Sequence, residues 1–276
     1  MAWYQSTQTL ALTLILRSIQ TKIDRLLAIG GWAILAIFPG VACAVELTTA
    51  GHSLQIIDLC KIDLRIDNVR TFWRDQDGLI FASIGRLSTA LNRTGERLVC
   101  ASNAGIYGKD LHPIGLYVEN GHVLRRLNTR KDGYGNFYLQ PNGVFMISDS
   151  GAAIVTTDEF QAPEGHSISN IRFATQSGPM LFRSDQINPV FAAGSDNRLI
   201  RNAVCTKTRD EIVLAKSRYP INFFDFATVL KDELGCHDGL YLDGTISELF
   251  PFEGPLIRAN FGPMIGAVEP WVNPSR

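Results

Sequence analysis

The sequence predicts an α+β fold in a single domain, with a mostly antiparallel or mixed β-sheet core and a few covering helices. Residues 60–67 alternate apolar and charged side chains without a break, which is typical of a strand with one face on a core. Short apolar segments separated by turn signals such as Asn120-Gly121 fill the middle of the chain. A strong helical pattern occurs once, after Asn222. Few helices and many short strands therefore define the predicted architecture.

Residues 1–44 are predicted to be a signal peptide or an N-terminal anchor. Three basic residues precede an uncharged run over residues 26–45, and Ala42-Cys43-Ala44 has the small-x-small pattern that a signal peptidase cleaves. Cleavage there would leave a domain over residues 45–276. This domain would lie outside the cytoplasm, because the positive charges that precede the uncharged run stay on the cytoplasmic side of the membrane. The alternatives are an uncleaved span or a lipid on Cys43, and only these would attach the domain to a membrane.

Charge and cysteine content narrow the possible partners. The formal net charge is −1, and it becomes −3 when residues 1–44 are removed with their three basic residues and one acidic residue. No cluster of Lys and Arg resembles those that neutralise a phosphate backbone, so we expect a sugar-phosphate or glycan ligand and no nucleic acid. Four cysteines then remain, and they allow three disulfide pairings or serve as buried thiols: Cys60, Cys100, Cys205 and Cys236.

Two buried strands are predicted to end in polar turns. Residues 97–101 follow a short helical pattern and lead directly to Asn103. Residues 239–242 follow the strong helix, which the side chain of Asn222 can cap, and they end at Asp243-Gly244. A strand end that follows a packed helix is a rigid place for a catalytic carboxylate.

Two β-hairpins are predicted between these strands. One joins residues 115–119 to residues 122–126 around Asn120-Gly121, a pair that tolerates the positive φ angles of a type I′ turn. The other joins residues 136–139 to residues 144–147. Further strands are expected at 152–156, 171–175, 180–182, 200–206 and 211–215.

Several common catalytic motifs are absent from the sequence. It has no Gly-x-x-x-x-Gly-Lys-Ser/Thr loop, no Gly-x-Ser-x-Gly elbow and no His-Glu-x-x-His helix. The five histidines form no ligand-spaced cluster, so the sequence requires no metal or other cofactor, although a divalent cation could assist at a phosphate. A hydrolase that pairs Ser177 or Cys100 with His112 or His237 is a further alternative.

Groups of small and polar residues at predicted strand ends carry a family resemblance. In chain order they are Asn103-Ala104-Gly105-Ile106-Tyr107, Pro113-Ile114-Gly115-Leu116-Tyr117, Asn128-Thr129 with Gly135-Asn136-Phe137, Thr175-Gln176-Ser177-Gly178-Pro179-Met180-Leu181, and Arg201-Asn202 with Tyr241-Leu242-Asp243-Gly244. This ordered set resembles the phosphodiester glycosidase family over roughly residues 83–250. Asp243-Gly244-Thr245-Ile246-Ser247 stands where that family usually has Asp-Gly-Gly-Gly-Ser.

The resemblance implies an exported hydrolase, periplasmic or extracellular, that cleaves glycosyl phosphodiesters at the anomeric carbon and acts on envelope or exopolysaccharide glycans. The residue types suit this chemistry, because a carboxylate stabilises an oxocarbenium-like transition state, whereas a guanidinium and bare glycine N–H groups bind phosphate. The predicted catalytic residues are Asp243, Arg201 and Asn103. The predicted substrate-binding residues are Gly105, Ser177, Gly178, Asn128, Asn136, Gly244 and Ser247.

Some roles remain open at the level of sequence. A second carboxylate is expected of ordinary glycosidases, and the sequence does not choose among Asp149, Asp238 and Glu248. Asp243 could instead cap a turn, Arg201 could pair with a structural carboxylate, and Asn103 and Ser177 could only join loops. An alternative function is a non-catalytic envelope module that binds glycan or phosphate polymers with the same pocket.

Overall fold

The computed structural model describes residues 45–51, 56–163, 166–243, 246–252 and 260–271. They belong to a compact unit, Cys43–Arg276, in which the described strands form three sheets with every pairing antiparallel. The mostly antiparallel core is therefore confirmed, but it consists of three sheets rather than one. No described helix is long and apolar enough to cross a membrane. The predicted signal peptide or anchor, residues 1–44, lies outside the described residues.

The largest sheet has seven strands in the order β1-β2-β13-β12-β14-β10-β11. The strands are β1 (Glu46–Ala50), β2 (Ile57–Asp63), β10 (Met180–Arg183), β11 (Gln186–Ile187), β12 (Asn202–Thr206), β13 (Glu211–Ser217) and β14 (Asp238–Tyr241). The central strands β12 and β13 are buried along nearly their whole length, because both faces of the sheet are covered. Their sequences are accordingly apolar on both faces.

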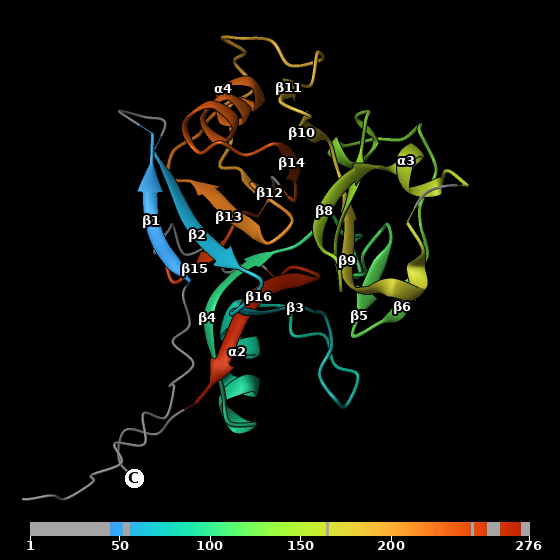
Figure 1. The fold of residues 1–276 in the computed structure, drawn as a ribbon, viewed down its shortest axis with the longest axis vertical. Helices are drawn as coiled ribbons and strands as arrows, with labels where there is room; N and C mark the ends of the chain where they lie inside the picture. Colours follow the sequence, from blue (N-terminus) through green and yellow to red (C-terminus); the bar gives the residue numbers. More distant parts are fainter. Residues whose placement is uncertain (1–44, 52–55, 164–165, 244–245, 253–259, 272–276) are drawn as a thin grey trace, which may run out of the picture. The chain divides into compact units, whose positions relative to one another are not determined.

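Two smaller sheets pack beside the first. A four-stranded sheet in the order β15-β4-β16-β3 contains β3 (Asn68–Phe72), β4 (Glu96–Asn103), β15 (Leu249–Phe250) and β16 (Met264–Pro270). A five-stranded sheet in the order β6-β5-β9-β7-β8 contains β5 (Tyr117–Glu119), β6 (His122–Arg125), β7 (Gly143–Ser148), β8 (Gly151–Thr156) and β9 (Ile171–Ser177). Figure 1 shows the five-stranded sheet on the right and the four-stranded sheet below the seven-stranded one.

One buried apolar cluster, the central core, is shared by the three sheets. It includes Leu214 and Leu240 from the seven-stranded sheet, Ile265 from the four-stranded sheet, and Phe145 and Phe173 from the five-stranded sheet. Each sheet therefore buries one face against the other two, which stabilises all three by removing apolar surface from water.

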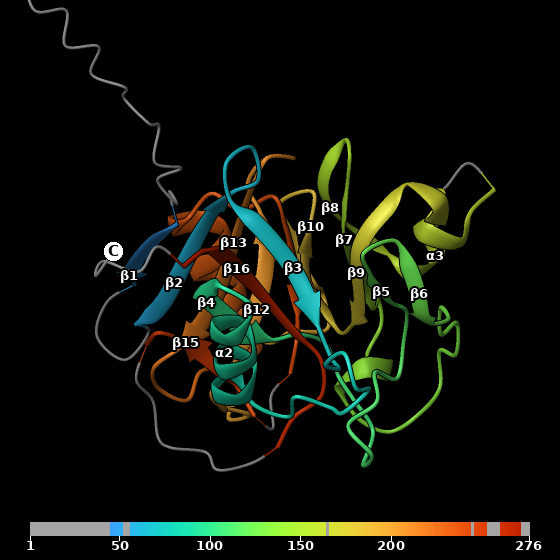
Figure 2. The same ribbon diagram turned by 90° about the horizontal axis from the view of Figure 1, so that it is seen from below.

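The helices cover outer faces of the sheets. Helix α4 (Phe223–Thr228) continues as a π-helical turn, η4 (Val229–Glu233), and its apolar side chains pack on the seven-stranded sheet (Figure 1). Helix α2 (Ile84–Arg93) lies along β4 (Figure 2) and buries Leu87 there. A short helix, α3 (Thr157–Gln161), packs on the five-stranded sheet. The Asn222 side chain accepts a hydrogen bond from the Asp225 N–H at 2.8 Å, which confirms the predicted helix cap.

Most predicted strands are present, and two predictions need correction. The hairpin around Asn120-Gly121 is confirmed as β5 and β6. Residues 136–139 are not a strand, because residues 136–138 form a 3₁₀ turn, η2 (Asn136–Tyr138), whose Phe137 carbonyl accepts a hydrogen bond from Asn142. β7 consequently pairs with β8 and β9. The strand predicted at 60–67 runs over 57–63, because the Asp67 carboxylate binds the Asp63 N–H and turns the chain.

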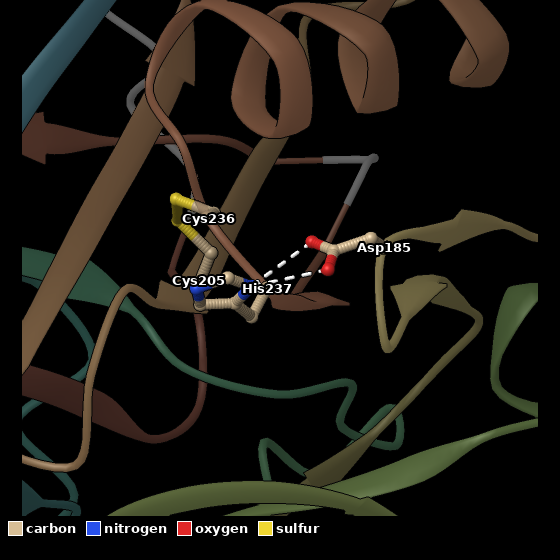
Figure 3. The surroundings of a disulfide bond; sticks show 4 residues. All are labelled: Asp185, Cys205, Cys236 and His237. Atoms are coloured by element: carbon tan, nitrogen blue, oxygen red, sulfur yellow. Dashed lines mark hydrogen bonds and ion pairs between the residues drawn. A yellow bond between two sulfur atoms is a disulfide. The ribbon is translucent and has the colours of Figure 1, made fainter.

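Two disulfides reinforce this arrangement. Cys60 in β2 pairs with Cys100 in β4 and thus links the seven-stranded sheet to the four-stranded sheet through the central core. Cys205 in β12 pairs with Cys236, just before β14. Figure 3 shows this second bond beside His237, whose Nδ1 lies 3.0 Å from a carboxylate oxygen of Asp185. Of the three possible pairings of the four cysteines, the structure contains the one in which the first pairs with the second and the third with the fourth.

A half-buried carboxyl group, that of Glu119, lies in the five-stranded sheet at the end of β5. The Tyr117 hydroxyl donates a hydrogen bond to the Glu119 carboxylate at 2.8 Å. Burial raises the pKa of Glu119 to about 7, although the hydrogen bonds from Tyr117 and from the Trp73 backbone act in the opposite direction. The folded protein therefore binds a proton here more tightly than the unfolded chain does.

The Cys60 to Cys100 disulfide should make a large contribution to stability. Its cysteines are 40 residues apart, and closing a loop of that size in the unfolded chain corresponds to about 4 kcal/mol. We expect Cys60→Ala combined with Cys100→Ala to lower the free energy of unfolding by about that amount, as measured by urea denaturation. A decrease below about 1 kcal/mol would contradict a linking role for this bond.

Stability should also fall as the pH rises from about 4.5 to about 7. Over this window Glu119 loses its proton in the unfolded chain and retains it in the folded protein. The free energy of unfolding therefore falls, by about 2–3 kcal/mol in total. The variant Glu119→Gln cannot titrate and should lack this component. Urea denaturation of both proteins at pH 4.5 and pH 8 measures it, because other titrating groups cancel in the comparison. Equal pH dependence in the two proteins would disprove the assignment.

Candidate active site

Three polar side chains stand side by side on the inner face of the seven-stranded sheet, at one end of the central core. Lys216 on β13 is directly opposite Asp58 on β2 and directly opposite Asn202 on β12. Opposite residues of antiparallel strands share a face, so these three form a continuous row, which we call the polar row. Asp58 and Asn202 are fully buried, and Lys216 is 4% exposed. Polar groups this deeply buried need partners.

Asn202 connects the polar row to the four-stranded sheet. Its Nδ2 donates to the Asn103 Oδ1 at 2.9 Å and to the Ser102 Oγ at 2.9 Å, both at the end of β4. Its Oδ1 accepts a hydrogen bond from the Asp243 N–H at 2.9 Å, just past the end of β14. One amide therefore joins the ends of β4, β12 and β14.

Asn103 holds the segment that follows Asp243. Its Nδ2 donates to the Ile246 carbonyl at 2.6 Å, and its Oδ1 accepts from the Glu248 N–H at 2.9 Å. The Ser247 hydroxyl donates to the Asp243 carbonyl at 2.8 Å. The backbones around Asp243 and Glu248 are thus positioned by side chains rather than by sheet pairing. Gly244, also predicted to bind substrate, lies outside the described residues.

Tyr107 lies beside two carboxylates. Burial raises the pKa of the Tyr107 phenol well above its ordinary value, and the charge of Asp243, a hydrogen bond to Asp243 and the charge of Glu248 raise it further. The phenol therefore stays protonated and can donate a hydrogen bond at any physiological pH. Burial also raises the pKa of Glu248, and the charge of Lys216 opposes that shift.

The structure chooses among the three candidates for a second carboxylate. Asp149 is 90% exposed in the turn between β7 and β8, where it pairs with Arg172. Asp238 is at the start of β14, the opposite end from Asp243, and it binds Arg183 at 2.7 Å. Glu248 alone of the three acts on Tyr107 together with Asp243. Asp243 and Glu248 are therefore the candidate carboxylate pair.

Ser177 and the predicted binding glycines occupy crowded positions. The Ser177 hydroxyl donates to the Leu242 carbonyl at 2.9 Å, which connects β9 to the end of β14. A Cβ on Gly178 would lie 2.7 Å from the Asn142 Cβ and 2.9 Å from the Phe137 carbonyl oxygen. A Cβ on Gly105, which has a φ of 81°, would overlap Thr175. Close packing explains these glycines, and phosphate binding by them remains a prediction.

Asn128 is brought near Ser177 by Gln176, a residue of the Thr175–Leu181 motif to which the sequence assigned no role. Gln176 accepts hydrogen bonds from the Leu116 and Asn128 N–H groups, each at 2.9 Å, and donates to the Asn128 carbonyl at 2.8 Å. The Asn128 side chain itself donates to the Ile114 carbonyl at 3.0 Å. Asn128 therefore has a role in holding its loop, and contact with substrate remains a prediction.

Arg201 lies on the other face of the sheet and is fully buried. Its Nε donates to the Ile221 carbonyl at 2.8 Å and its Nη2 to the Asn197 carbonyl at 2.8 Å, while its guanidinium carbon is 3.6 Å from the Phe223 ring centroid. The guanidinium also interacts with Tyr241. No structural carboxylate takes part in these contacts, and direct binding of phosphate by Arg201 stays a prediction.

Tyr241 links Arg201 and Asn136 to the site. Burial raises the pKa of the Tyr241 phenol well above its ordinary value, and the charge of Asp243 adds to this shift, while Arg201 and Asn136 oppose it. Asn136 is at the start of η2, where the predicted second hairpin would have placed it in a strand. The structure thus connects Asn136 to the surroundings of Asp243 through Tyr241.

The contacts of Cys100 and of the two histidines do not favour the alternative hydrolase, in which Ser177 or Cys100 would pair with His112 or His237. Cys100 is bonded to Cys60 and cannot act as a free nucleophile. His112 lies against Trp73, Arg74 and Asp110. His237 pairs with Asp185. Within the described part of the chain, no three His, Cys, Asp or Glu residues are grouped so that they could hold a metal ion.

Three residues near Asn202 and Asp243 were not among the residues predicted for the site. Asp58 and Lys216 lie just outside the strands predicted over residues 60–67 and 211–215, and Tyr107 belongs to a predicted motif without an assigned role. A charged residue in an otherwise apolar strand, such as Lys216 after Ile212-Val213-Leu214-Ala215, was the available signal.

The chain is similar in sequence to a known family and to a bacterial protein. The family model described as phosphodiester glycosidase matches residues 96–262. The uncharacterized protein YigE of Escherichia coli K12 is 32% identical over 216 residues, which cover 78% of this chain and 82% of that protein.

Solved structures with a similar fold have low sequence identity. The zebrafish N-acetylglucosamine-1-phosphodiester alpha-N-acetylglucosaminidase catalytic domain, auto-inhibited by its pro-peptide, has a TM-score of 0.52 at 13% identity and covers 81% of each chain. A hypothetical protein from Synechocystis has a TM-score of 0.51 at 15% identity, covering 81% of this chain and 61% of its own. A putative exported protein from Burkholderia pseudomallei has a TM-score of 0.51 at 10% identity, with 77% and 74% covered. These likenesses concern the fold.

Removing the Asn202 amide should destabilise the protein strongly. Asn202→Ala leaves the buried Asp243 N–H without its hydrogen bond and separates β12 from Asn103. We expect the free energy of unfolding to fall by about 2–4 kcal/mol, since several buried polar groups lose partners. The exposed Asn68→Ala in β3 is the control, with an expected change within about 0.5 kcal/mol. Urea denaturation that finds the two variants equally stable would contradict the connecting role of Asn202.

Proposed function

Because this chain belongs to the phosphodiester glycosidase family, we propose that it hydrolyses glycosyl phosphodiesters at the anomeric carbon of the sugar. The observation that carries this proposal is the pair of carboxylates Asp243 and Glu248, whose backbones are held by Asn202, Asn103 and Ser247 and which both act on the protonated Tyr107 phenol. Two carboxylates at one site are the arrangement that glycoside hydrolysis uses. The fold shared with the zebrafish glycosidase domain is consistent with it.

In the proposed reaction, a water molecule attacks the anomeric carbon and a phosphate monoester leaves. The new bond joins the water oxygen to that carbon, and the bond to the phosphate oxygen breaks with its electron pair staying on the phosphate. Asp243 stabilises the positive charge of the oxocarbenium-like transition state. Ionised Glu248 accepts the proton of the water. The leaving phosphate is already a stable anion and therefore needs little protonation.

The remaining site residues would hold this pair in place. Asn103 and Ser247 fix the backbones on both sides of the turn after Asp243. Tyr107 would keep the Asp243 carboxylate oriented by donating its hydroxyl hydrogen to it. Arg201 would act mainly through Tyr241, so the phosphate would be bound chiefly by neutral donors at the predicted positions Ser177, Gly178 and Gly244.

We also propose that the protein acts outside the cytoplasm, on envelope or exopolysaccharide glycans. Two disulfides support this location, because such bonds form and persist in oxidising compartments. The predicted signal or anchor segment, residues 1–44, agrees with it.

The variant Asp243→Asn should lose turnover and keep substrate binding. Loss of a catalytic carboxylate is expected to lower kcat by about 10²- to 10⁴-fold with KM changed little. The assay is release of free sugar from a panel of sugar-1-phosphodiesters by the purified protein. Asp149→Asn, in the exposed turn away from the site, is the matched control and should retain wild-type kcat.

Two outcomes would overturn the proposal. Release of sugar phosphate instead of free sugar would mean cleavage on the other side of phosphorus. Binding of these diesters by the wild type without any turnover would instead indicate a non-catalytic glycan-binding module.

A further inference from the structure

We propose that Tyr134 is a specificity-determining residue, which binds a second sugar ring of a phosphate-containing glycan at the rim of the candidate active site. The inference rests on the proposed function, because it names the substrate class that the site prefers. That class is a diester in which the phosphate joins two sugar rings, rather than one sugar and a small alcohol. Tyr134 has no part in bond cleavage and acts on the affinity for the leaving group.

Tyr134 is an exposed aromatic residue on an exposed loop. The loop, which we call the rim loop, spans residues 129–135, and every residue in it is exposed. The Tyr134 ring is open to solvent over its whole surface. Exposed aromatic side chains of this kind are typical of binding surfaces, because they offer a large contact area at a low cost in conformational entropy. The ring is therefore available to a ligand.

The Tyr138 ring holds the rim loop on both sides of Tyr134. The guanidinium carbon of Arg130 lies 5.4 Å from the Tyr138 ring centroid. Gly133 packs on the same ring so closely that a Cβ there would lie 2.5 Å from the Tyr138 Cδ2. The Arg130 N–H also donates to the Asn128 Oδ1 at 3.1 Å. Because its neighbours are packed in this way, Tyr134 is presented to a ligand without the cost of ordering the loop.

Both ends of the rim loop are attached to the end of β9. Before the loop, the Asn128 N–H donates to the Gln176 side chain at 2.9 Å, and Gln176 donates to the Asn128 carbonyl at 2.8 Å. After the loop, η2 lies against Gly178, since a Cβ on Gly178 would be 2.9 Å from the Phe137 carbonyl oxygen. The rim loop thus begins and ends beside the segment that contains Ser177 and Gly178.

The same segment leads to the candidate catalytic carboxylate. The Ser177 hydroxyl donates to the Leu242 carbonyl at 2.9 Å, and Asp243 is the next residue in the chain. In the proposed reaction Asp243 acts at the anomeric carbon, whereas Ser177 and Gly178 bind the phosphate. The rim loop therefore adjoins the phosphate side of the site, where the leaving group would lie.

The charge of the rim loop and of the residues before it suits an anionic glycan. Residues 125–131 contain three arginines, one lysine and no acidic residue, although the whole chain has a formal net charge of −1. Lys131 pairs with Asp158 at 2.7 Å, and Arg130 lies 3.9 Å from Asp132. Both pairs are exposed, and exposed ion pairs are weak, so their cations stay available to a phosphate group.

A sugar ring that carries phosphate matches these two features together. The C–H groups on one face of the sugar pack on the negative face of an aromatic ring. Phosphate oxygens accept charge-assisted hydrogen bonds from arginine and lysine. An apolar partner would instead remove these cations from water without supplying a counter-charge, which is costly.

The test uses two diesters of each sugar-1-phosphate in the panel described above. One diester has methanol as the leaving group, and the other has the 6-hydroxyl of methyl glucoside. We expect the wild type to prefer the two-ring diester by about tenfold in kcat/KM, mainly through a lower KM, because a sugar ring stacked on an aromatic ring contributes on this order. Tyr134→Ala should abolish this preference.

Two variants serve as controls. Tyr134→Phe retains the ring and should keep the preference of the wild type. Trp271→Ala removes another exposed aromatic residue, whose N–H donates to the Gly95 carbonyl at the opposite end of β4 from Asn103, and it should also keep the preference. Because the Tyr134 ring is exposed, Tyr134→Ala should leave the melting temperature unchanged, so misfolding would not explain a lost preference.

Binding without turnover separates this inference from the proposed function. Isothermal titration calorimetry of Asp243→Asn, with and without Tyr134→Ala, gives Kd for the two diesters and should show the same tenfold preference and its loss. If the wild type cleaves no diester of the panel, the proposed function fails, and titration of the wild type in place of Asp243→Asn still decides the role of Tyr134. A wild type without preference for the two-ring diester, or an equal preference in Tyr134→Ala, would refute the inference.

Discussion

The hydrogen bonds of the Asn202 side chain are the contacts on which the candidate active site depends. A single amide binds Asn103 in one sheet and the Asp243 backbone at the edge of another, and it accepts as well as donates. An amide side chain offers both kinds of group, with two donor hydrogens, in a small volume. Because all of these partners are buried, the geometry is costly to break, and the backbone of Asp243, the candidate catalytic carboxylate, is held without regular sheet pairing.

The central core explains why such a polar site can exist. Its apolar residues and the Cys60 to Cys100 disulfide bring three sheets together, so that strand ends from different sheets meet at one place. On the seven-stranded sheet the inner face is apolar over most of its length, and the row that contains Asp58 and Lys216 is polar. Apolar burial supplies the stability, and the charged row at its edge supplies a low-polarity setting in which a carboxylate can be tuned.

Local signals predicted the elements well where one residue pattern decides the structure. The Asn120-Gly121 hairpin and the Asn222 helix cap are set by backbone angles and by side-chain donors within four residues. Prediction failed at residues 136–139, where an apolar run fits a strand or a 3₁₀ turn equally well and long-range contacts choose. The same limit left the second carboxylate open, since Asp149, Asp238 and Glu248 are equal candidates until the fold separates them.

The sequence by itself determined the family, a β-rich core with few helices, and the positions of Asp243 and Asn103 at strand ends. These follow from short motifs and from periodicity, which are properties of neighbouring residues. Only the tertiary structure decided that Glu248 and Asp243 both act on Tyr107, that Arg201 is buried on the opposite face, and that Lys216 and Asp58 are buried opposite each other on neighbouring strands. The reason is physical: burial and electrostatic interaction depend on distances through space, and residues far apart in the chain set those distances.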